Sequence, residues 1–269
     1  MRGKTGVRPV INNTSTTQCI EMGAFVLWWF ENLELDQDGA SGNVITNNTN
    51  ANGSVFYNIK ISDGGGAGTS GGATGQSISA CEITGVVGDA LSALAASSIA
   101  FGNYIHDTSA DGIEITSAGP AVIVISRNIL DTCAGKGINF SGATTTPSHR
   151  LFIDGNTIYG CGDSGLEVTD ADSQMMLINN IFSENGNAAG EYNVEWVAGT
   201  AEANSFHGWN VFYHSGGGGG ANLSGLTVNA QVASSEFTTD PAFTDAAGGD
   251  FSISSTSPAK ASGFPGQFL

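Results

Sequence analysis

Positive charge is the scarcest feature of this sequence. The 269 residues contain 8 Lys and Arg against 25 Asp and Glu, which gives a formal net charge of −17 at pH 7. Nucleic acids and anionic lipid surfaces are held mainly by Lys and Arg. The composition therefore excludes nucleic acid as a partner, and polyanionic glycans meet the same repulsion unless cations bridge the two surfaces.

Long apolar segments are also missing. The most apolar run, residues 24–30 (AFVLWWF), is far too short to cross a bilayer, so we expect no membrane insertion. Residues 1–13 carry basic side chains without the apolar stretch of a secretory signal peptide. The four cysteines form no CxxC pair, which argues against a zinc knuckle or a thioredoxin-type motif.

Glycine and apolar residues, by contrast, are plentiful. The chain has 39 glycines, 40% hydrophobic residues and only 12% charged residues. A disordered chain combines low hydrophobicity with high charge, and this chain has neither property. The composition predicts short strands that bury a core and are joined by many turns.

A repeated pattern of a β-rich run, an asparagine, any residue and an apolar residue indicates the architecture. Its asparagines are Asn103, Asn128, Asn156, Asn180 and Asn210, and Cys81 occupies the same place one repeat earlier. The intervals from 81 to 210 are 22, 25, 28, 24 and 30 residues. Two looser relatives, around residues 30–33 and 56–59, lie upstream.

A second element follows in phase, with a small residue before alternating apolar and polar positions. Examples are residues 112–115 (GIEI), 137–140 (GINF) and 165–168 (GLEV). Alternation with a period of two marks a strand with one buried face. Because each repeat is too short to bury its apolar face alone, stacked coils must share one core. We predict an all-β parallel β-helix of about 8–9 coils with an inward Asn ladder.

Cys133 and Cys161 support the same register, since each follows its ladder asparagine by five residues. They are expected to be stacked neighbours. Two alternatives are open: a buried ladder of free thiols, or a disulfide between coils if the compartment is oxidising.

These N-x-I and G-I-x-I coils resemble the right-handed parallel β-helix proteins of the pectate-lyase-like superfamily, of bacterial and phage type. The resemblance covers residues 75–215 firmly and 8–62 loosely, and 240–259 resemble the closing segment of such proteins. We therefore expect coils over 1–215, with a glycine-rich loop insertion at about 63–76. A glycine-rich loop and an irregular capping segment are expected over 216–269. The resemblance implies extracellular, cell-surface or virion-borne work on glycans.

Chemistry is expected on one outward column of the G-I-x-I strands. The column holds Ser92, Glu114, Asn139, Glu167 and Glu195, with Asp111 and Asp163 just before two of the strands. Neighbouring coils lie about 4.8 Å apart, so the carboxylates bracket the separations used by glycosidases. We predict Glu114, Glu167, Glu195, Asp111 and Asp163 as catalytic candidates. The alternative is an ordinary solvated strand face. Stacked oxygens of this kind also suit Ca²⁺.

The binding candidates are Lys136, Asn139, Arg127, Trp28 and Trp29. A uronate lyase of the resembled superfamily usually takes its base from Arg or Lys, here Arg127, Lys136 or Arg150. No known lyase motif surrounds these residues, and the acidic chain suits polyuronate poorly. The two tryptophans fit core or cap packing, a sugar-stacking platform or a subunit contact.

Three hypotheses follow. The first is a glycan-active enzyme, a glycoside hydrolase rather than a uronate lyase. The second is a non-catalytic, adhesin-like or tailspike-like protein of a virion or cell surface that binds polysaccharide along the solenoid. The third is a structural segment of a larger assembly. An uncovered first coil and the resemblance to phage spikes favour a homotrimer or larger assembly that covers the N-terminal coil.

Overall fold

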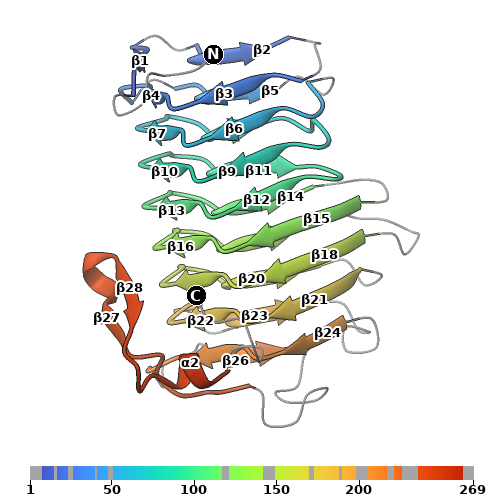
Figure 1. Ribbon diagram of the computed structural model, residues 1–269, viewed down its shortest axis with the longest axis vertical. Helices are drawn as coiled ribbons and strands as arrows, with labels where there is room; N and C mark the ends of the chain where they lie inside the picture. The colour runs from blue at the N-terminus through green and yellow to red at the C-terminus, as the bar shows by residue number, and fades with distance from the viewer. Residues whose placement is uncertain are drawn as a thin grey trace.

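A computed structural model shows a solenoid of parallel strands stacked along one long axis (Figure 1). The structure describes residues 8–14, 17–23, 27–39, 41–47, 51–116, 121–141, 149–169, 173–187, 190–197, 205–216, 221–225 and 236–262. Each coil passes through three sheets in turn, which we call sheets A, B and C. Within the described residues, sheet A has eight strands, and sheets B and C have nine each. The predicted parallel β-helix of about 8–9 coils is confirmed.

The strands of each sheet come from successive coils and pair in parallel. Sheet A consists of β3 (Trp29–Glu31), β6 (Val55–Tyr57), β9 (Ser77–Ser79), β12 (Ile99–Phe101), β15 (Ala121–Ser126), β18 (His149–Asp154), β21 (Gln174–Ile178) and β24 (Ser205–Gly208). Sheet B consists of β1 (Val10–Asn12), β4 (Glu34–Asp36), β7 (Lys60–Ser62), β10 (Glu82–Thr84), β13 (Tyr104–His106), β16 (Ile129–Asp131), β19 (Thr157–Tyr159), β22 (Ile181–Ser183) and β25 (Val211–Tyr213). Sheet C consists of β2 (Ile20–Met22), β5 (Ile45–Asn47), β8 (Thr69–Ser70), β11 (Leu91–Leu94), β14 (Ile113–Ile115), β17 (Ile138–Phe140), β20 (Leu166–Val168), β23 (Tyr192–Trp196) and β26 (Ala221–Ser224).

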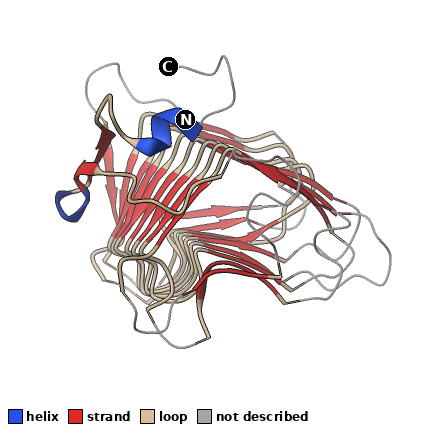
Figure 2. Cartoon of the chain, turned by 90° about the horizontal axis from the view of Figure 1, so that it is seen from below, coloured by secondary structure: helices blue, strands red, loops and turns tan. Residues whose placement is uncertain are grey.

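The core lies between the three sheets, as the view along the axis shows (Figure 2). In sheet B the middle residue of each strand points inward, so that Ile83 pairs with Ile105 and Ile105 with Leu130. All three are fully buried. The period-two alternation read from the sequence therefore separates core from surface, because successive side chains of a strand point to opposite faces.

The Asn ladder is confirmed at the bend between sheets A and B. In the middle of the ladder, Asn128 Nδ2 donates to Asn156 Oδ1 at 2.9 Å, and Asn156 Nδ2 donates to Asn180 Oδ1 at 3.0 Å. The second proton of the Asn156 amide goes to the carbonyl oxygen of Ile125, one coil earlier, at 2.9 Å. Both amide protons are thus used, which explains why a polar residue is stable in this buried position.

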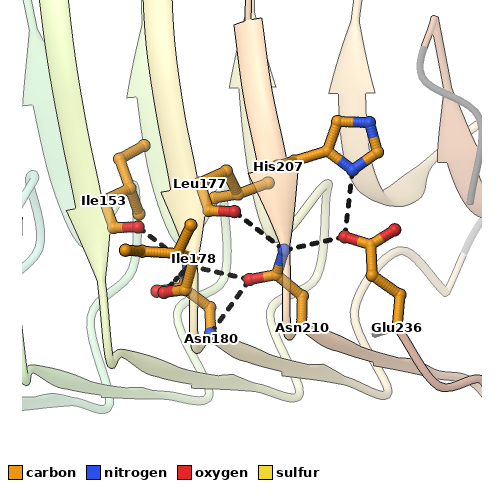
Figure 3. A network of polar contacts seen from close by, with 7 residues as sticks. All are labelled: Ile153, Leu177, Ile178, Asn180, His207, Asn210 and Glu236. Carbon is orange, nitrogen blue, oxygen red and sulfur yellow. Dashed lines mark hydrogen bonds and ion pairs between the residues drawn. The ribbon is translucent and has the colours of Figure 1, made fainter. Parts of the chain in front are cut away.

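The ladder ends on a carboxylate. Asn210 Nδ2 donates to Leu177 O and to Glu236 Oε1, each at 2.9 Å (Figure 3). Glu236 Oε1 also lies 2.9 Å from Nδ1 of His207, and both side chains are fully buried. Because every ladder amide donates toward the C-terminus, the last one needs an acceptor that is not another asparagine. Glu236 supplies it.

In the two upstream coils the ladder position is apolar. Leu33 and Ile59 are buried there, and the asparagines Asn32 and Asn58 lie one residue earlier, with φ of 56° and 52°. In each coil this preceding residue makes the bend in the left-handed region, which Asn tolerates better than most residues. Asn58 Nδ2 donates to Asn32 Oδ1, so the two amides pair outside the core. The upstream coils share the bend of the repeat but not its inward amide.

The glycine-rich segment expected as a loop insertion forms part of an ordinary coil. Strand β8 runs through it and pairs with β5 and β11 of the neighbouring coils. A Cβ added at Gly68 would lie 2.6 Å from the carbonyl oxygen of Ala90. Glycine is needed here because adjacent backbones approach closely, a steric reason that composition alone does not distinguish from flexibility.

Cys133 and Cys161 are buried neighbours, as their spacing predicted, and both are free thiols in the structure. The amide of Gly162 donates to the carbonyl oxygen of Cys133 at 2.8 Å, which fixes the two coils in register at this point. The hydrogen bond that the Cys161 thiol makes with Cys133, together with burial, raises the pKa of Cys161 well above its usual range. These contacts fit the thiol ladder rather than the disulfide.

The C-terminal segment folds back on the solenoid. Beyond residue 215, β26 continues sheet C, and most of the glycine run 216–220 lies outside the described residues. An antiparallel hairpin of β27 (Phe243–Asp245), the 3₁₀ turn η1 (Ala246–Gly248) and β28 (Asp250–Ile253) then lies beside sheet B, and helix α2 (Pro258–Ser262) follows (Figure 1). The rings of Phe243 and Phe251 pack edge-on against Tyr159, with centroids 6.0 and 5.5 Å away.

None of the described helices has the length and apolar character needed to cross a membrane.

Candidate functional site

The predicted outward column forms a continuous row on sheet C. Glu114 pairs with Asn139, Asn139 with Glu167, and Glu167 with Glu195, on β14, β17, β20 and β23. All four side chains are half-buried, and the residues that flank them in each strand are buried in the core. We call this row, with the polar residues of the turns that precede its strands, the acidic face.

Ser92 and Glu114 form the N-terminal end of the row. Strand β11 has an irregularity between Leu91 and Leu94, and Ser92 Oγ donates from there to Glu114 Oε2 at 3.0 Å. Partial burial raises the pKa of Glu114, and the nearby Asp89 raises it further against the opposing effect of Ser92. Glu114 therefore holds a proton more readily than a solvated glutamate does.

Asp111 organises the turn beside this end. Its Oδ1 accepts the backbone N–H of Lys136, and its Oδ2 accepts from Asn139 Nδ2, both at 2.7 Å. The backbone N–H of Asp111 in turn donates to Asp89 Oδ1 at 3.0 Å. Both oxygens of Asp111 are thus engaged in fixing Lys136 and Asn139. Asp111 therefore holds Lys136 and Asn139 in position beside the glutamates.

Lys136 lies within the acidic face. Its Nζ is 3.5 Å from Glu167 Oε2. Partial burial alone would lower the pKa of Lys136, but Glu167, Asp111 and Asp163 together raise it above its ordinary value. Lys136 is consequently protonated at neutral pH, where a lyase base must be able to accept a proton.

Glu167 and Glu195 occupy adjacent strands near the C-terminal end of the row. Burial raises the pKa of Glu167, with Lys136 acting in the opposite direction and Glu195 and Glu191 adding to the rise. The hydroxyl of Ser164, fully buried, lies 3.1 Å from both Glu191 Oε2 and Glu195 Oε2. Since a hydroxyl has one proton, Ser164 can donate to only one of the two carboxylates at a time.

The strand spacing sets the separations along the row. Residues on adjacent strands, such as Glu167 and Glu195, are about 4.8 Å apart along the axis, and those two coils apart, such as Glu114 and Glu167, about 10 Å. Retaining glycosidases place their two carboxyl groups about 5–5.5 Å apart and inverting ones about 6.5–9.5 Å. Carboxylates on adjacent strands therefore lie close to the retaining distance, and carboxylates two strands apart lie close to the upper limit of the inverting distance.

Sequence reasoning missed three members of the acidic face: Asp89, Ser164 and Glu191. Asp89 and Ser164 each directly precede the small residue ahead of a sheet C strand, and Glu191 directly precedes β23. In the coils of Ser92, Glu114, Asn139 and Glu167, the position before the small residue lies three residues ahead of the outward residue of the row. Extending the column analysis to that position would have found Asp89 and Ser164 but not Glu191.

The other predicted binding residues lie elsewhere. Arg127 occupies the left-handed bend before sheet B, with φ of 56°, and its guanidinium lies over the ring of Phe101 at 5.7 Å. Trp29 points outward from sheet A and is 58% exposed, while Trp28 stacks on the buried Phe30 with centroids 5.9 Å apart. The structure thus keeps Lys136 and Asn139 beside the glutamates and places Arg127 and both tryptophans on another side of the solenoid.

A second polar cluster, unforeseen from the sequence, lies on sheet B. Tyr104 OH donates to Asp131 Oδ2 at 3.3 Å, and the Tyr104 ring stacks on His106 at 4.3 Å. Nδ1 of His106 is 2.8 Å from Asp107 Oδ2. Burial, and then Asp131, raise the pKa of Tyr104 to about 12, and burial raises that of Asp131. The hairpin adjoins this cluster, since a Cβ at Gly249 would lie 3.0 Å from the Tyr104 hydroxyl.

Metal coordination depends on how these acidic groups are arranged. In the part of the chain that the structure describes, no three His, Cys, Asp or Glu side chains are arranged to hold a metal ion. The acidic face offers carboxylates in pairs, whereas Ca²⁺ takes six to eight oxygen ligands. A Ca²⁺ ion on this face would therefore keep water or ligand oxygens in much of its coordination shell.

Comparison with protein families agrees with this architecture. The family described as the right-handed β-helix region matches residues 70–237, more than half of the chain. The matched range includes the Asn ladder and the whole carboxylate row, and it fits the resemblance to the pectate-lyase-like superfamily. A search of the curated proteins finds no match. From its repeat, its three parallel sheets and this match, the chain belongs to the right-handed β-helix family.

Proposed function

We propose that this protein binds an extended polysaccharide along the acidic face, on the outside of a cell or on a virion. One observation supports the proposal above the others. Glu114, Asn139, Glu167 and Glu195 stand in register on four adjacent strands, half-buried and pointing outward. A row of this kind repeats the same hydrogen-bonding group along a line, which suits a ligand that is itself a repeating chain.

The chemistry of the row favours a neutral glycan. Carboxylates accept hydrogen bonds from sugar hydroxyls, and charge-assisted hydrogen bonds are the stronger kind. A polyuronate would bring its own carboxylates against Glu114, Glu167 and Glu195, with Lys136 as the cation among them. Neutral polysaccharides meet no such repulsion, so dextran, xylan or galactomannan should bind better than polygalacturonate or alginate.

Hydrolysis of the bound glycan is the catalytic form of this proposal, and it depends on Glu167 and Glu195. With its raised pKa, Glu167 would donate a proton to the glycosidic oxygen as the bond to the anomeric carbon breaks. Glu195, one strand away, would attack that carbon and form a glycosyl-enzyme ester. Glu167, now ionised, would take a proton from the water that hydrolyses the ester. The protonated state of Lys136 makes β-elimination the less favoured reaction.

The test combines binding and cleavage on one panel of polysaccharides, with and without Ca²⁺. Binding is measured by affinity electrophoresis, hydrolysis by release of reducing ends and elimination by the absorbance of unsaturated uronate. Glu167→Gln and Glu195→Gln are compared with Glu34→Gln, which removes one charge from sheet B. We expect binding to a neutral glycan that weakens only in the sheet C variants. Loss of cleavage in the same variants would make the protein a glycoside hydrolase.

A non-catalytic role, as a structural or adhesive component of a particle or surface, is the second candidate. Its supporting observation is that Asp111 and Ser164, which lie among the carboxylates, are engaged in fixing the turns. Binding that depends on Glu167 and Glu195 without cleavage of any polysaccharide would favour this role. Failure of every glycan to bind would overturn the catalytic and the adhesive forms of the proposal and leave the structural role.

A further inference from the structure

The outer face of sheet A is apolar along the whole solenoid. The outward row, in register from the first coil to the last, consists of Trp29, Val55, Ser77, Ile99, Val124, Phe152, Met176 and Phe206. All but one of these side chains are apolar. Trp29, Ile99, Met176 and Phe206 are 58%, 41%, 37% and 39% exposed. We call this surface the sheet A face.

The concentration of apolar side chains on this face is specific to it. Twelve large hydrophobic side chains are exposed in the described residues, and seven belong to sheet A strands: Trp29, Tyr57, Ile99, Phe101, Val122, Met176 and Phe206. Two more, Leu27 and Trp28, directly precede β3. Scattered exposed hydrophobics are normal, but a contiguous patch of this kind marks an interaction surface.

The other two faces have different properties. Sheet C carries the carboxylate row, and sheet B carries polar side chains and the packed hairpin β27–β28. No described segment packs over the sheet A face in the same way. Its outward strand positions contain three charged residues, Glu31, Arg150 and Asp154, so the face is nearly neutral in a chain of net charge −17.

A shallow hollow interrupts the face near its C-terminal end. Its volume is about 350 Å³, and Phe152, Met176, Phe206 and the polar side chains of Arg150 and Gln174 line it. The hollow and the large side chains beside it give the face an uneven shape, against which a second surface of complementary shape can pack.

We infer that the sheet A face associates with the same face of a second copy of this chain. Two chains of net charge −17 repel each other, and the nearly neutral sheet A face is where they can approach with least electrostatic cost. Both copies present a row with the same strand spacing, so their side chains can interdigitate along its whole length. The acidic face, on another sheet, stays open in this arrangement, so the inference does not depend on the proposed function.

The available area agrees with a dimer of moderate affinity. Eight strands at about 4.8 Å span about 38 Å, and four residues along a strand span about 13 Å. The face therefore measures about 500 Å² on each copy and about 1,000 Å² on two copies. That total is near the lower limit of a specific interface, so concentration should control the association.

Sedimentation velocity over a range of protein concentrations, at low and high salt, tests the inference with the full chain. We expect a monomer that becomes a dimer as concentration rises, and tighter association in high salt because salt screens the repulsion between two acidic chains. Ile99→Glu should weaken association by about tenfold or more, since a dimer would bury an unpaired carboxylate on each copy. Met176→Glu should do the same from a different coil.

Val87→Glu is the matched control. Val87 is 59% exposed in the turn before sheet C, so this variant adds the same charge away from the sheet A face and should associate like the wild type. Thermal melts show whether each variant is folded. A wild type that stays monomeric at every concentration, or equal weakening by Val87→Glu, would overturn the inference. A monomeric wild type whose glycan binding is lost in Ile99→Glu would also overturn it and assign the face to the glycan.

Discussion

Removing one rung from the middle of the Asn ladder should destabilise the fold more than its small volume suggests. In Asn156→Ala, three buried groups lose their hydrogen bonds: the backbone N–H of Asn128, one amide proton of Asn128 and the carbonyl oxygen of Ile125. The backbone N–H of Asn156 keeps its bond to Asn180 Oδ1. Each buried group left unsatisfied costs about 1–3 kcal/mol, so we expect a loss of about 3–5 kcal/mol in the free energy of unfolding.

Urea unfolding followed by circular dichroism measures this loss. Asn12→Ala is the control, because Asn12 is exposed and its side chain makes a single 3.4 Å hydrogen bond to Asp36. That variant should stay within about 0.5 kcal/mol of the wild type. A loss below about 1 kcal/mol in Asn156→Ala would mean that water or a repacked coil satisfies the three groups, and it would refute the argument that the ladder stabilises the bend.

Three further predictions test other parts of the structure. Gly68→Ala should cost about 1–3 kcal/mol, because its methyl group meets a backbone carbonyl of the next coil, whereas Gly72→Ala, with nothing within 4 Å of the added carbon, should be nearly neutral by the same unfolding assay. The raised pKa of Glu114 means that its protonation stabilises the folded state: this contribution is present at acidic pH, below the unfolded-state pKa, and is lost as pH rises through the folded-state pKa. The rise in melting temperature from neutral to mildly acidic pH should therefore be smaller in Glu114→Gln, and an unchanged pH profile would contradict the assignment. Finally, a thiol reagent should label Cys19 alone in the folded protein, since the other three thiols are buried, and labelling of all four at equal rates before unfolding would contradict the packing of the coils.

The solenoid and its register were predictable because each coil repeats the same two physical requirements. An inward amide must find partners in the coils on either side, and a strand with one buried face must alternate. These requirements mark Asn128 and Glu167 in the sequence without knowledge of the rest of the chain. The row of Glu114, Asn139, Glu167 and Glu195 followed directly from them, and the structure places these residues on four adjacent strands.

The side of the solenoid on which each stack of residues lies was harder to predict than which residues stack. Repeat spacing shows which residues stack, but not which side of the solenoid each stack occupies. Arg127 and Trp29 were predicted as binding residues together with Lys136 and Asn139, and the bend before Asn128 and the outward phase of β3 place them on another side of the solenoid. The apolar character of the sheet A face was hidden for a related reason. Strand β15 alternates within a run of β-branched residues, so its outward Val124 resembles the inward Ile125.

A steric requirement explains why the glycine-rich segment was predicted as a loop but forms part of a coil. The glycine-rich segment 64–75 suggested a flexible loop, but in the structure Gly68 allows two backbones to approach closely. Composition shows that these residues have no side chain, but it does not show whether the reason is flexibility or the close approach of another backbone. Only the positions of the neighbouring coils separate the two causes, and those positions depend on contacts about twenty residues away in the sequence.

The direction of the Asn ladder also limits how such a chain can lengthen during evolution. A duplicated coil inserted between Asn103 and Asn210 would carry its own asparagine, which accepts from the rung before it and donates to the rung after it. A coil inserted after Asn210 would instead separate the last amide from Glu236 and its partner His207. Growth by internal duplication therefore preserves every hydrogen bond, whereas extension at the end requires the terminal carboxylate to move with the new last coil.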